Sequence, residues 1–146
     1  MTETNVSDID LVLRDGADEV DLVWHISAFK SQMIWPKIEL AKASSLVHDA
    51  GKLLKVIIET AYLSSEEIKT ASLICRDAGA DFVKTSTGFA PSGARLEDVR
   101  LIRDVLPAEV RIKASGGIKT KEQAVAFVEA GADRIGTSSG VQIVSH

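Results

Sequence analysis

Cysteine, histidine and runs of basic residues are scarce in this chain of 146 residues. It has one cysteine and three histidines. Cys75 alone cannot form an internal disulfide, and the histidines lack the spacing of a zinc site, so we expect no structural metal. The 17 basic and 21 acidic residues give a net charge of −4, and no run of Lys and Arg occurs. This composition lacks the basic surface that nucleic-acid binding requires, so we expect no nucleic-acid partner.

Long apolar runs are also missing. No stretch approaches the roughly 18 uninterrupted apolar residues of a membrane-spanning helix. The N-terminal segment MTETNVSDID is polar and acidic, unlike a signal peptide. We therefore expect a cytoplasmic protein with no membrane partner. Hydrophobic residues still make up 45% of the chain, which is enough for one core, and the length predicts a single domain over residues 1–146.

A repeated phrase organises the chain. It reads RDGADEVDLV from Arg14, RDAGADFVKT from Arg76 and EAGADRIGTS from Glu129. Each copy predicts the end of a helix at its glycine, followed by the start of a strand. Two more strand-like segments, LLKVIIET and EVRIKAS, lie between the copies. The predicted strands are near 19–24, 53–60, 81–86, 109–115 and 133–138.

Helical patterns fill the intervals between these strands. They cover 36–50, 64–78, 95–106 and 120–130. Pro36 suits a first helical turn, and Ser64 or Ser65 and Thr120 are candidate caps. The connections are too long for hairpins, so the strands should run parallel and be covered by helices. The predicted class is α/β.

Two α/β architectures compete. A doubly wound sheet of five strands fits the length, whereas a complete eightfold barrel usually needs about 250 residues. Against the open sheet, no Gly-rich phrase of the GxGxxG or P-loop type follows the first strand. Polar residues also stand at the strand ends in nearly every unit, which is typical of barrels.

Two lysines stand at equivalent strand ends. Lys84 lies in DFVKTSTG, where alternation places it on one face with Phe82 and Ser86. Lys113 lies in RIKASGG, one unit later and on the adjacent strand. A single lysine at a strand end usually has no chemical role and simply extends its ammonium group into water. Two partly buried neighbouring amines disfavour each other's charge, and a neutral amine near pH 7 can attack a carbonyl to form a Schiff base.

Two carboxylates are candidate partners of these lysines. Asp21, in DEVDLVW, points the same way relative to its strand end. It either pairs with a lysine for solubility or moves protons with Lys113 and a water. Glu59 ends the strand segment IIET and is a candidate partner of Lys55 or of a lysine at the rim.

Loops of small residues follow the later strands. They are TSTG (85–88), SGG (115–117) and TSSG (137–140). Glycine lets the backbone approach an anion closely, and the N–H groups at the start of the next helix can bind it. One such loop is an ordinary turn between a strand and a helix. Three in consecutive units are typical of the phosphate site of barrels.

These phrases resemble those of the deoxyribose-phosphate aldolases, class I Schiff-base aldolases with a barrel fold. The matching segments are GADEVDLV, LKVIIETAYL, GADFVKTSTGF, IKASGGIKT and AGADRIGTSSG, which cover nearly the whole chain from Gly16 onward. The resemblance implies a lyase that reversibly cleaves 2-deoxyribose 5-phosphate into glyceraldehyde 3-phosphate and acetaldehyde. It also implies that neither a metal nor an organic cofactor is needed.

The resemblance assigns roles to individual residues. Lys84 matches the lysine that forms the imine, Lys113 the second lysine that lowers its pKa, and Asp21 the aspartate of the proton relay. The positions that match those holding the sugar phosphate are Gly88, Gly116, Gly117, Ser138 and Ser139. Gln32 stands where the family tends to carry glycine, and His25 where asparagine is frequent.

The resemblance covers only the later five of the family's eight strand–helix units. It therefore implies a partial (β/α) barrel, a truncated aldolase-type domain. A second copy in a homo-oligomer, or the N-terminal segment of the chain itself, would cover its open edges. Two alternatives remain open. One is a catalytically impaired barrel fragment that binds phosphorylated ligands or self-associates, and the other is a different Schiff-base aldolase on the same scaffold.

Overall fold

The five strands lie side by side in the order in which they occur along the chain. The computed structural model describes residues 9, 11, 13–87, 90 and 92–136. The sheet is parallel, and its order is β1-β2-β3-β4-β5. The strands are β1 (Glu19–Val23), β2 (Leu53–Ile57), β3 (Phe82–Lys84), β4 (Arg111–Ser115) and β5 (Arg134–Gly136). A doubly wound sheet reverses its strand order part-way, whereas a β/α barrel adds each strand beside the last. The order therefore identifies a partial barrel.

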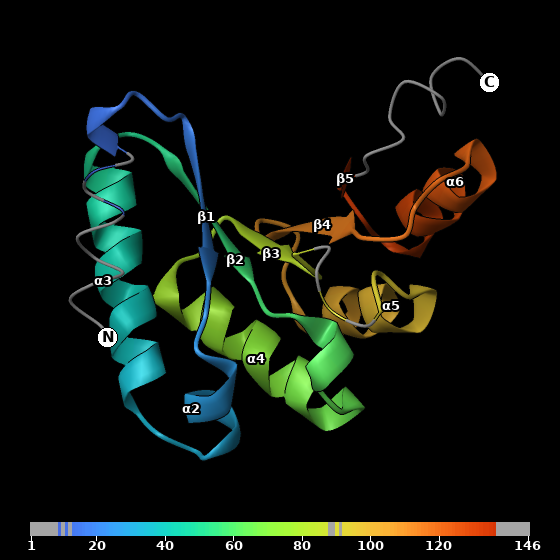
Figure 1. Ribbon diagram of the computed structural model, residues 1–146, viewed down its shortest axis with the longest axis horizontal. Helices are drawn as coiled ribbons and strands as arrows, with labels where there is room; N and C mark the ends of the chain where they lie inside the picture. Colours follow the sequence, from blue (N-terminus) through green and yellow to red (C-terminus); the bar gives the residue numbers. More distant parts are fainter. Residues whose placement is uncertain (1–8, 10, 12, 88–89, 91, 137–146) are drawn as a thin grey trace.

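Helices cover the outside of this curved sheet. They are α2 (Ile26–Lys30), α3 (Trp35–Asp49), η1 (Thr60–Tyr62), α4 (Ser65–Ala78), α5 (Leu96–Val105) and α6 (Lys121–Ala130). Figure 1 shows the long helices α3 to α6 arranged around the strands. The four predicted helices are confirmed to within one residue at each end, whereas α2 and η1 were not predicted. Among the described residues, no helix has the length and apolar character needed to cross a membrane.

The predicted helix starts are confirmed by their hydrogen bonds. The Ser64 hydroxyl accepts the N–H of Glu67 at 3.2 Å, and the Glu67 carboxylate accepts the N–H of Ser64 at 2.9 Å. Thr120 and Gln123 form the same reciprocal pair at the start of α6. Each pair satisfies two N–H groups that a helix start leaves without partners. Pro36 lies in the first turn of α3, as predicted.

The aspartate of the repeated phrase ties neighbouring strands together. Asp81 precedes β3, and its Oδ2 accepts the N–H of Leu54 in β2 at 2.8 Å. The same oxygen lies 2.7 Å from Nε2 of His48 on α3. In the next copy, Asp133 accepts the N–H of Ile112 in β4 at 2.9 Å. The repeat therefore encodes a contact from the start of one strand to the preceding strand.

Two backbone conformations match expectations from the sequence. Gly79 ends α4 with a φ of 90°, the left-handed conformation expected for the glycine of the repeat. Gln32 has a φ of 59°. It occupies the position where the resembling family tends to carry glycine, the residue that adopts this conformation without steric cost.

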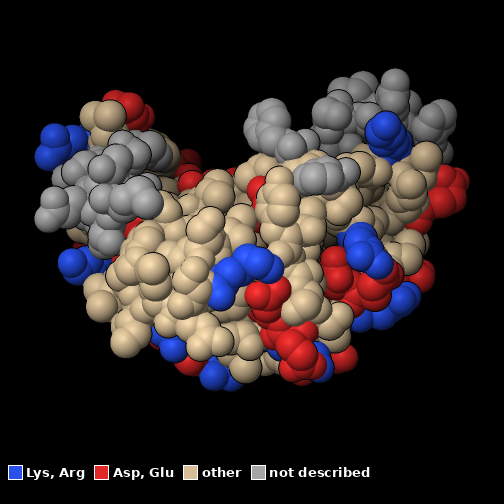
Figure 2. Space-filling model, turned by 60° about the horizontal axis from the view of Figure 1, so that its bottom comes forward, with Lys and Arg blue, Asp and Glu red and all other residues tan. Residues whose placement is uncertain are grey.

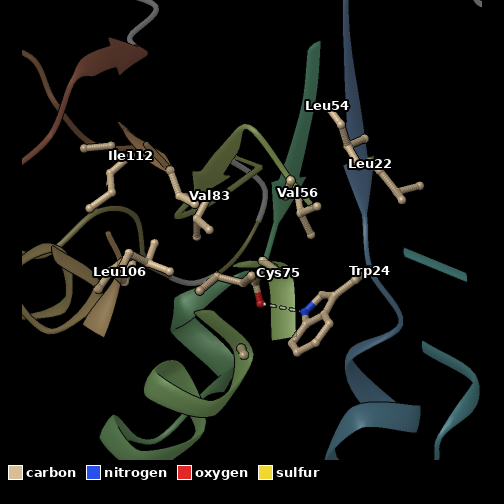
Figure 3. Packing of buried hydrophobic residues seen from close by; sticks show 14 of the residues in the cluster. Leu22, Trp24, Leu54, Val56, Cys75, Val83, Leu106 and Ile112 are labelled. Atoms are coloured by element: carbon tan, nitrogen blue, oxygen red, sulfur yellow. Dashed lines mark hydrogen bonds between the residues drawn. The ribbon is translucent and has the colours of Figure 1, made fainter. Parts of the chain in front are cut away.

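The core lies between the strands and the helices. Alternate strand residues face it, among them Leu22, Leu54, Val56, Val83 and Ile112 (Figure 3). Trp24 packs in the same layer, and its Nε1 donates to the carbonyl of Ile58 at 3.1 Å. Cys75 is fully buried there, and burial raises the pKa of its thiol to about 12. It is a packing residue.

Replacing Asp81 with alanine should lower the free energy of unfolding by about 1–3 kcal/mol, because the N–H of Leu54 loses its acceptor. Asp77→Ala is the control, since this exposed carboxylate pairs with its neighbour Arg76 and with no other side chain among the described residues. It should change the same quantity by less than about 0.5 kcal/mol. Urea unfolding followed by circular dichroism measures both, and equal losses would contradict the strand-tying role.

Candidate active site

Charged side chains line the inner side of the curved sheet. They alternate along each strand with the core residues. Arg111 of β4 is one of them, and its guanidinium lies 5.7 Å from the centre of the Phe82 ring. The other six are Glu19 and Asp21 of β1, Lys55 of β2, Lys84 of β3, Lys113 of β4 and Arg134 of β5. We call these six residues the concave cluster. The strand register pairs Asp21 with Lys55 and Lys84 with Lys113. In Figure 2 basic and acidic side chains lie interspersed along the lower surface of the molecule.

An ion pair joins the two edge strands across the inner side. Nη1 of Arg134 on β5 lies 2.9 and 2.8 Å from the two carboxylate oxygens of Glu19 on β1. The Arg134 guanidinium also lies 4.5 Å from the centre of the Phe82 ring. In a flat sheet, four strand spacings would separate β1 from β5 by roughly 19 Å. The side chains meet because the sheet curls as in a barrel.

The pairing continues from Glu19 toward the strand ends. Nζ of Lys55 lies 2.9 Å from Oε1 of Glu19 and 3.1 Å from Oδ1 of Asp21. The other oxygen of Asp21, Oδ2, accepts a hydrogen bond from Nζ of Lys84 at 3.0 Å. Lys113, beside Lys84 in the register, forms no ion pair within the described part of the chain. The concave cluster thus holds four cations and two carboxylates, an excess that attracts anions.

Two of the predicted site residues, Lys113 and Asp21, have shifted pKa values. Burial lowers the pKa of Lys113, and the charges of Lys55 and Lys84 lower it further. Burial alone would raise the pKa of Asp21, but hydrogen bonds from Lys84 and Lys55 bring it below its usual value. Asp21 is therefore an anion at neutral pH, and Lys113 has an increased neutral fraction. The expected lowering of the Lys84 pKa by Lys113 stays a prediction. In the opposite direction, the charge of Lys84 contributes to the lowered pKa of Lys113.

The segment after Lys84 is locked to β4. The strand ends at Lys84, so the predicted alternation applies to Phe82 and Lys84 but does not set the direction of Ser86. The Thr85 hydroxyl accepts the N–H of Ser115 at 3.0 Å, and the Ser115 hydroxyl donates to the carbonyl of Ser86 at 2.7 Å. These buried bonds fix the ends of β3 and β4 relative to each other, and with them the two lysines.

Glu59 holds the same segment from the other side. Its carboxylate accepts the N–H of Thr87 at 3.1 Å and the Thr87 hydroxyl at 2.7 Å. The expected pairing with Lys55 or a rim lysine is therefore wrong, because Lys55 is held by the carboxylates of β1. Glu59 is buried and has a φ of 58°, a left-handed conformation that costs a non-glycine residue energy. The Thr87 bonds help to offset this cost.

Only part of the predicted phosphate site is described. Gly116 and Gly117 follow β4 with φ values of 87° and 77°. The N–H of Ala94 donates to the carbonyl of Gly116 at 3.0 Å, and a Cβ at Gly93 would clash with that carbonyl. A Cβ at Gly117 would meet no atom within 4 Å, so this turn borders open space. The other predicted positions, Gly88, Ser138 and Ser139, lie outside the described residues.

Sequence reasoning missed three members of the concave cluster. Lys55 was mentioned only as a partner of Glu59, and Glu19 and Arg134 were not predicted at all. The available signal was the period of two along a strand, which places Glu19 beside Asp21 on the inner face. No group of three or more His, Cys, Asp or Glu side chains that could hold a metal ion occurs among the described residues.

Comparison with known proteins identifies the family. All of residues 1–146 match the model of the DeoC/LacD family aldolases. The chain belongs to the DeoC/LacD aldolase family. A curated deoxyribose-phosphate aldolase of Thermococcus kodakarensis is 51% identical over 144 residues, which cover 98% of this chain and 64% of that protein. The corresponding protein of Aquifex aeolicus is 51% identical over 147 residues, which cover 97% of this chain and 64% of that protein.

Solved structures of aldolases superpose closely on this chain. The aldolase QR15 is 49% identical with a TM-score of 0.93, covering 99% of this chain and 65% of that one. The deoxyribose phosphate aldolase of Aeropyrum pernix, described as a unique tetrameric structure, is 34% identical with a TM-score of 0.89, covering 99% and 61%. The predicted family is thus confirmed, and this member spans 64% of the length of the two curated relatives.

Lys113 should titrate below the ordinary lysine value of 10.5, because its burial and two neighbouring cations favour the neutral amine. A lowered pKa means a larger neutral fraction at every pH below the midpoint. NMR titration of the lysine side-chain nitrogens, with Lys113 assigned by a Lys113→Arg variant, measures the midpoint. The chain unfolded in urea is the control and should return the ordinary value. A folded-state midpoint at or above 10.5 would contradict the described surroundings of Lys113.

Proposed function

We propose that this chain is a Schiff-base lyase that reversibly cleaves 2-deoxyribose 5-phosphate into glyceraldehyde 3-phosphate and acetaldehyde. The observation that carries the proposal is the arrangement of three predicted residues on the inner face of the sheet. Lys84 is hydrogen-bonded to Asp21 and lies beside Lys113 in the register. The curated relatives that match this chain are deoxyribose-phosphate aldolases.

The reaction needs a nucleophilic amine and a proton acceptor at one place. The Lys84 amine attacks the aldehyde carbon of the open sugar, and loss of water gives an iminium ion. The bond between carbons 2 and 3 then breaks, and its electron pair moves toward the iminium while the carbon-3 hydroxyl gives up its proton. This releases glyceraldehyde 3-phosphate. The remaining enamine takes up a proton, and hydrolysis frees acetaldehyde and the Lys84 amine.

Asp21 and Lys113 are suited to moving these protons. Oδ2 of Asp21 lies 3.0 Å from Nζ of Lys84, within reach of a direct transfer. The lowered pKa of Lys113 makes its amine an acceptor at a pH where an ordinary lysine is charged. Neither group needs a metal or an organic cofactor for this step. We assign both residues to a proton relay that also includes water.

The positive excess of the concave cluster suits a phosphorylated substrate. We place the phosphate at the turns after β3, β4 and β5, on Gly88, Gly116, Gly117, Ser138 and Ser139. Support comes from the consecutive positive φ angles at Gly116 and Gly117 and from the open space beside Gly117. Holding the phosphate there would keep the aldehyde end of the sugar within reach of Lys84.

A second candidate function is a barrel fragment that binds phosphorylated ligands without turnover. The chain spans 64% of the length of the two curated relatives. The remaining third of each relative lies outside the matched part. In this alternative, a substrate bound by the five strands keeps the charge contacts of the concave cluster but is not positioned for cleavage. Chemistry and binding must therefore be measured separately.

Borohydride reduction in the presence of acetaldehyde should leave an N-ethyl group on Lys84, mapped by mass spectrometry. Lys84→Arg keeps a cation beside Asp21 but removes the nucleophile, so we expect a loss of at least about 10³-fold in trapping. Lys69→Arg, on the exposed face of α4, is the matched control and should react like the unmodified chain.

The same experiment separates the alternatives. An adduct on Lys84 together with cleavage of deoxyribose 5-phosphate supports the proposed lyase. An adduct with no cleavage supports the impaired fragment, and preferential cleavage of another sugar phosphate supports a different Schiff-base aldolase. If no adduct forms on Lys84 at saturating acetaldehyde, the Schiff-base chemistry is wrong for this chain.

We also infer that the chain forms a homo-oligomer. Within the described part of the sheet, β1 pairs only with β2 and β5 only with β4, so each leaves one edge without a partner strand. Large apolar side chains are exposed around the start of α3, at Met33, Ile34 and Ile38. The Aeropyrum pernix relative is described as tetrameric. A cytoplasmic location stays a prediction.

Light scattering coupled to gel filtration should give a mass that is a multiple of 15.7 kDa, because pairing between copies would cover exposed edges and apolar side chains. Met33→Glu should shift the mass toward the single chain if the start of α3 takes part. A monodisperse species of 15.7 kDa at micromolar concentration would overturn the inferred assembly.

A further inference from the structure

Lys55 is the most deeply buried cation of the concave cluster, and the proposed reaction gives it no role. Its side chain is 7% exposed, and its ammonium contacts one oxygen each of Glu19 and Asp21. Burial alone would lower the pKa of Lys55, but hydrogen bonds to Glu19 and Asp21 raise it above its usual value. Lys55 is therefore a fixed positive charge at the pH of the proposed reaction.

Stability alone does not account for this buried cation. Replacing a buried ion pair with apolar residues of similar volume is often neutral or stabilising, because desolvating two charges is costly. If Lys55 were removed, each carboxylate would still have a cation beside it. Glu19 would keep its contacts with Arg134, and Asp21 would keep its bond to Lys84. The position of Lys55 points instead to an effect on Asp21.

The contacts of Asp21 are divided between its two oxygens. Oδ1 faces Lys55 at 3.1 Å, and Oδ2 faces Lys84 at 3.0 Å. A carboxylate held at one oxygen by a buried ammonium cannot rotate freely, so its second oxygen stays aimed at Lys84. The Lys55 charge also acts on Lys113, where it lowers the pKa together with burial and Lys84.

We propose that Lys55 is a positioning residue, which holds Oδ1 of Asp21 so that Oδ2 remains on the Lys84 amine. This inference rests on the proposed function and deepens it, since it acts on the same reaction. The charged groups that face Lys55 are Glu19 and Asp21 of β1, Lys84 of β3, Lys113 of β4 and, through Glu19, Arg134 of β5.

The test compares three variants by their rate of borohydride trapping on Lys84 across pH. In Lys55→Met, Oδ1 of Asp21 loses its partner and Lys113 loses a neighbouring cation. Oδ2 is then no longer held on the Lys84 amine, and Lys113 gains a proton more readily, so trapping at pH 7 should fall about tenfold and recover as the pH is raised. Lys55→Arg keeps the charge and should retain most of the rate.

Lys52→Met is the matched control. Lys52 precedes the same strand, and it pairs with the exposed Asp18 at 3.0 Å, at the opposite end of β2 from the proposed reaction. Removing its charge should leave the pH profile of trapping unchanged. A trapping rate that falls at pH 7 and recovers at high pH in Lys55→Met, beside an unchanged profile in Lys52→Met, distinguishes positioning from a loss of structure.

A second measurement does not depend on catalysis. The carboxyl carbon of Asp21, followed by NMR, should titrate at a higher pH in Lys55→Met than in the unmodified chain, because one of the two hydrogen bonds that lower its pKa is gone. If Lys55→Met does not unfold cooperatively, Lys55→Gln replaces it, since the amide can still donate a hydrogen bond but carries no charge. Lys52→Met should again have no effect.

The outcomes separate the two proposals. If the unmodified chain forms no adduct on Lys84, the proposed function fails, and the Asp21 titration alone decides whether Lys55 holds that carboxylate. If the adduct forms but Lys55→Met and Lys52→Met share one pH profile, the proposed function stands and the role of Lys55 is overturned. An unchanged Asp21 titration in the charge-free variant overturns it as well.

Discussion

The contact between Arg134 and Glu19 is the constraint on which the site depends. It joins the first and last strands of the sheet across the inner face, at distances of 2.9 and 2.8 Å. The sheet must curl for these side chains to meet. Curling also brings the inner faces of β1 to β4 toward one another, so that Asp21 on β1 reaches Lys84 on β3, two strands away. Without this curvature the same residues would point into solvent separately.

Charges of opposite sign alternate through the concave cluster, and the alternation ends at Lys113. Arg134, Glu19, Lys55, Asp21 and Lys84 follow one another, each bonded to the next. Lys113 stands beside Lys84 but has no carboxylate among the described residues. Burial lowers its pKa, and the charges of Lys55 and Lys84 lower it further against the opposing charge of Asp21. The two amines therefore differ: Lys84 bonds a carboxylate, whereas Lys113 forms no ion pair among the described residues and has a lowered pKa.

Much of the fold could be predicted from the sequence because its signals are local. Helix caps such as Ser64, the glycine of the repeat and the β-branched strands depend on residues a few positions apart. The strand-end lysines were also found locally, since Lys84 and Lys113 stand in matching phrases. The local patterns left a doubly wound sheet and a barrel open, the family resemblance predicted a partial barrel, and the strand order confirms it.

The rest of the site depends on contacts between residues far apart in the sequence. Arg134 and Glu19 are separated by 115 positions, so their pairing has no sequence signature. Glu59 was expected to meet a lysine, yet a left-handed backbone turns it to Thr87. Lys55 sits within an apolar strand, where only the period of two hints at its direction. Which side chains meet across the sheet depends on how strongly the sheet curls, and the sequence has no local signal for that curvature.

The central claim is that Lys84, held by Asp21 beside Lys113, is the amine that captures the aldehyde. A crystal structure determined after reduction with acetaldehyde tests it most directly, because it shows both the modified nitrogen and its neighbours. The account predicts continuous density for an ethyl group on Nζ of Lys84, with Lys55 still on the far oxygen of Asp21. An ethyl group on Lys113, with Lys84 unmodified, would contradict it.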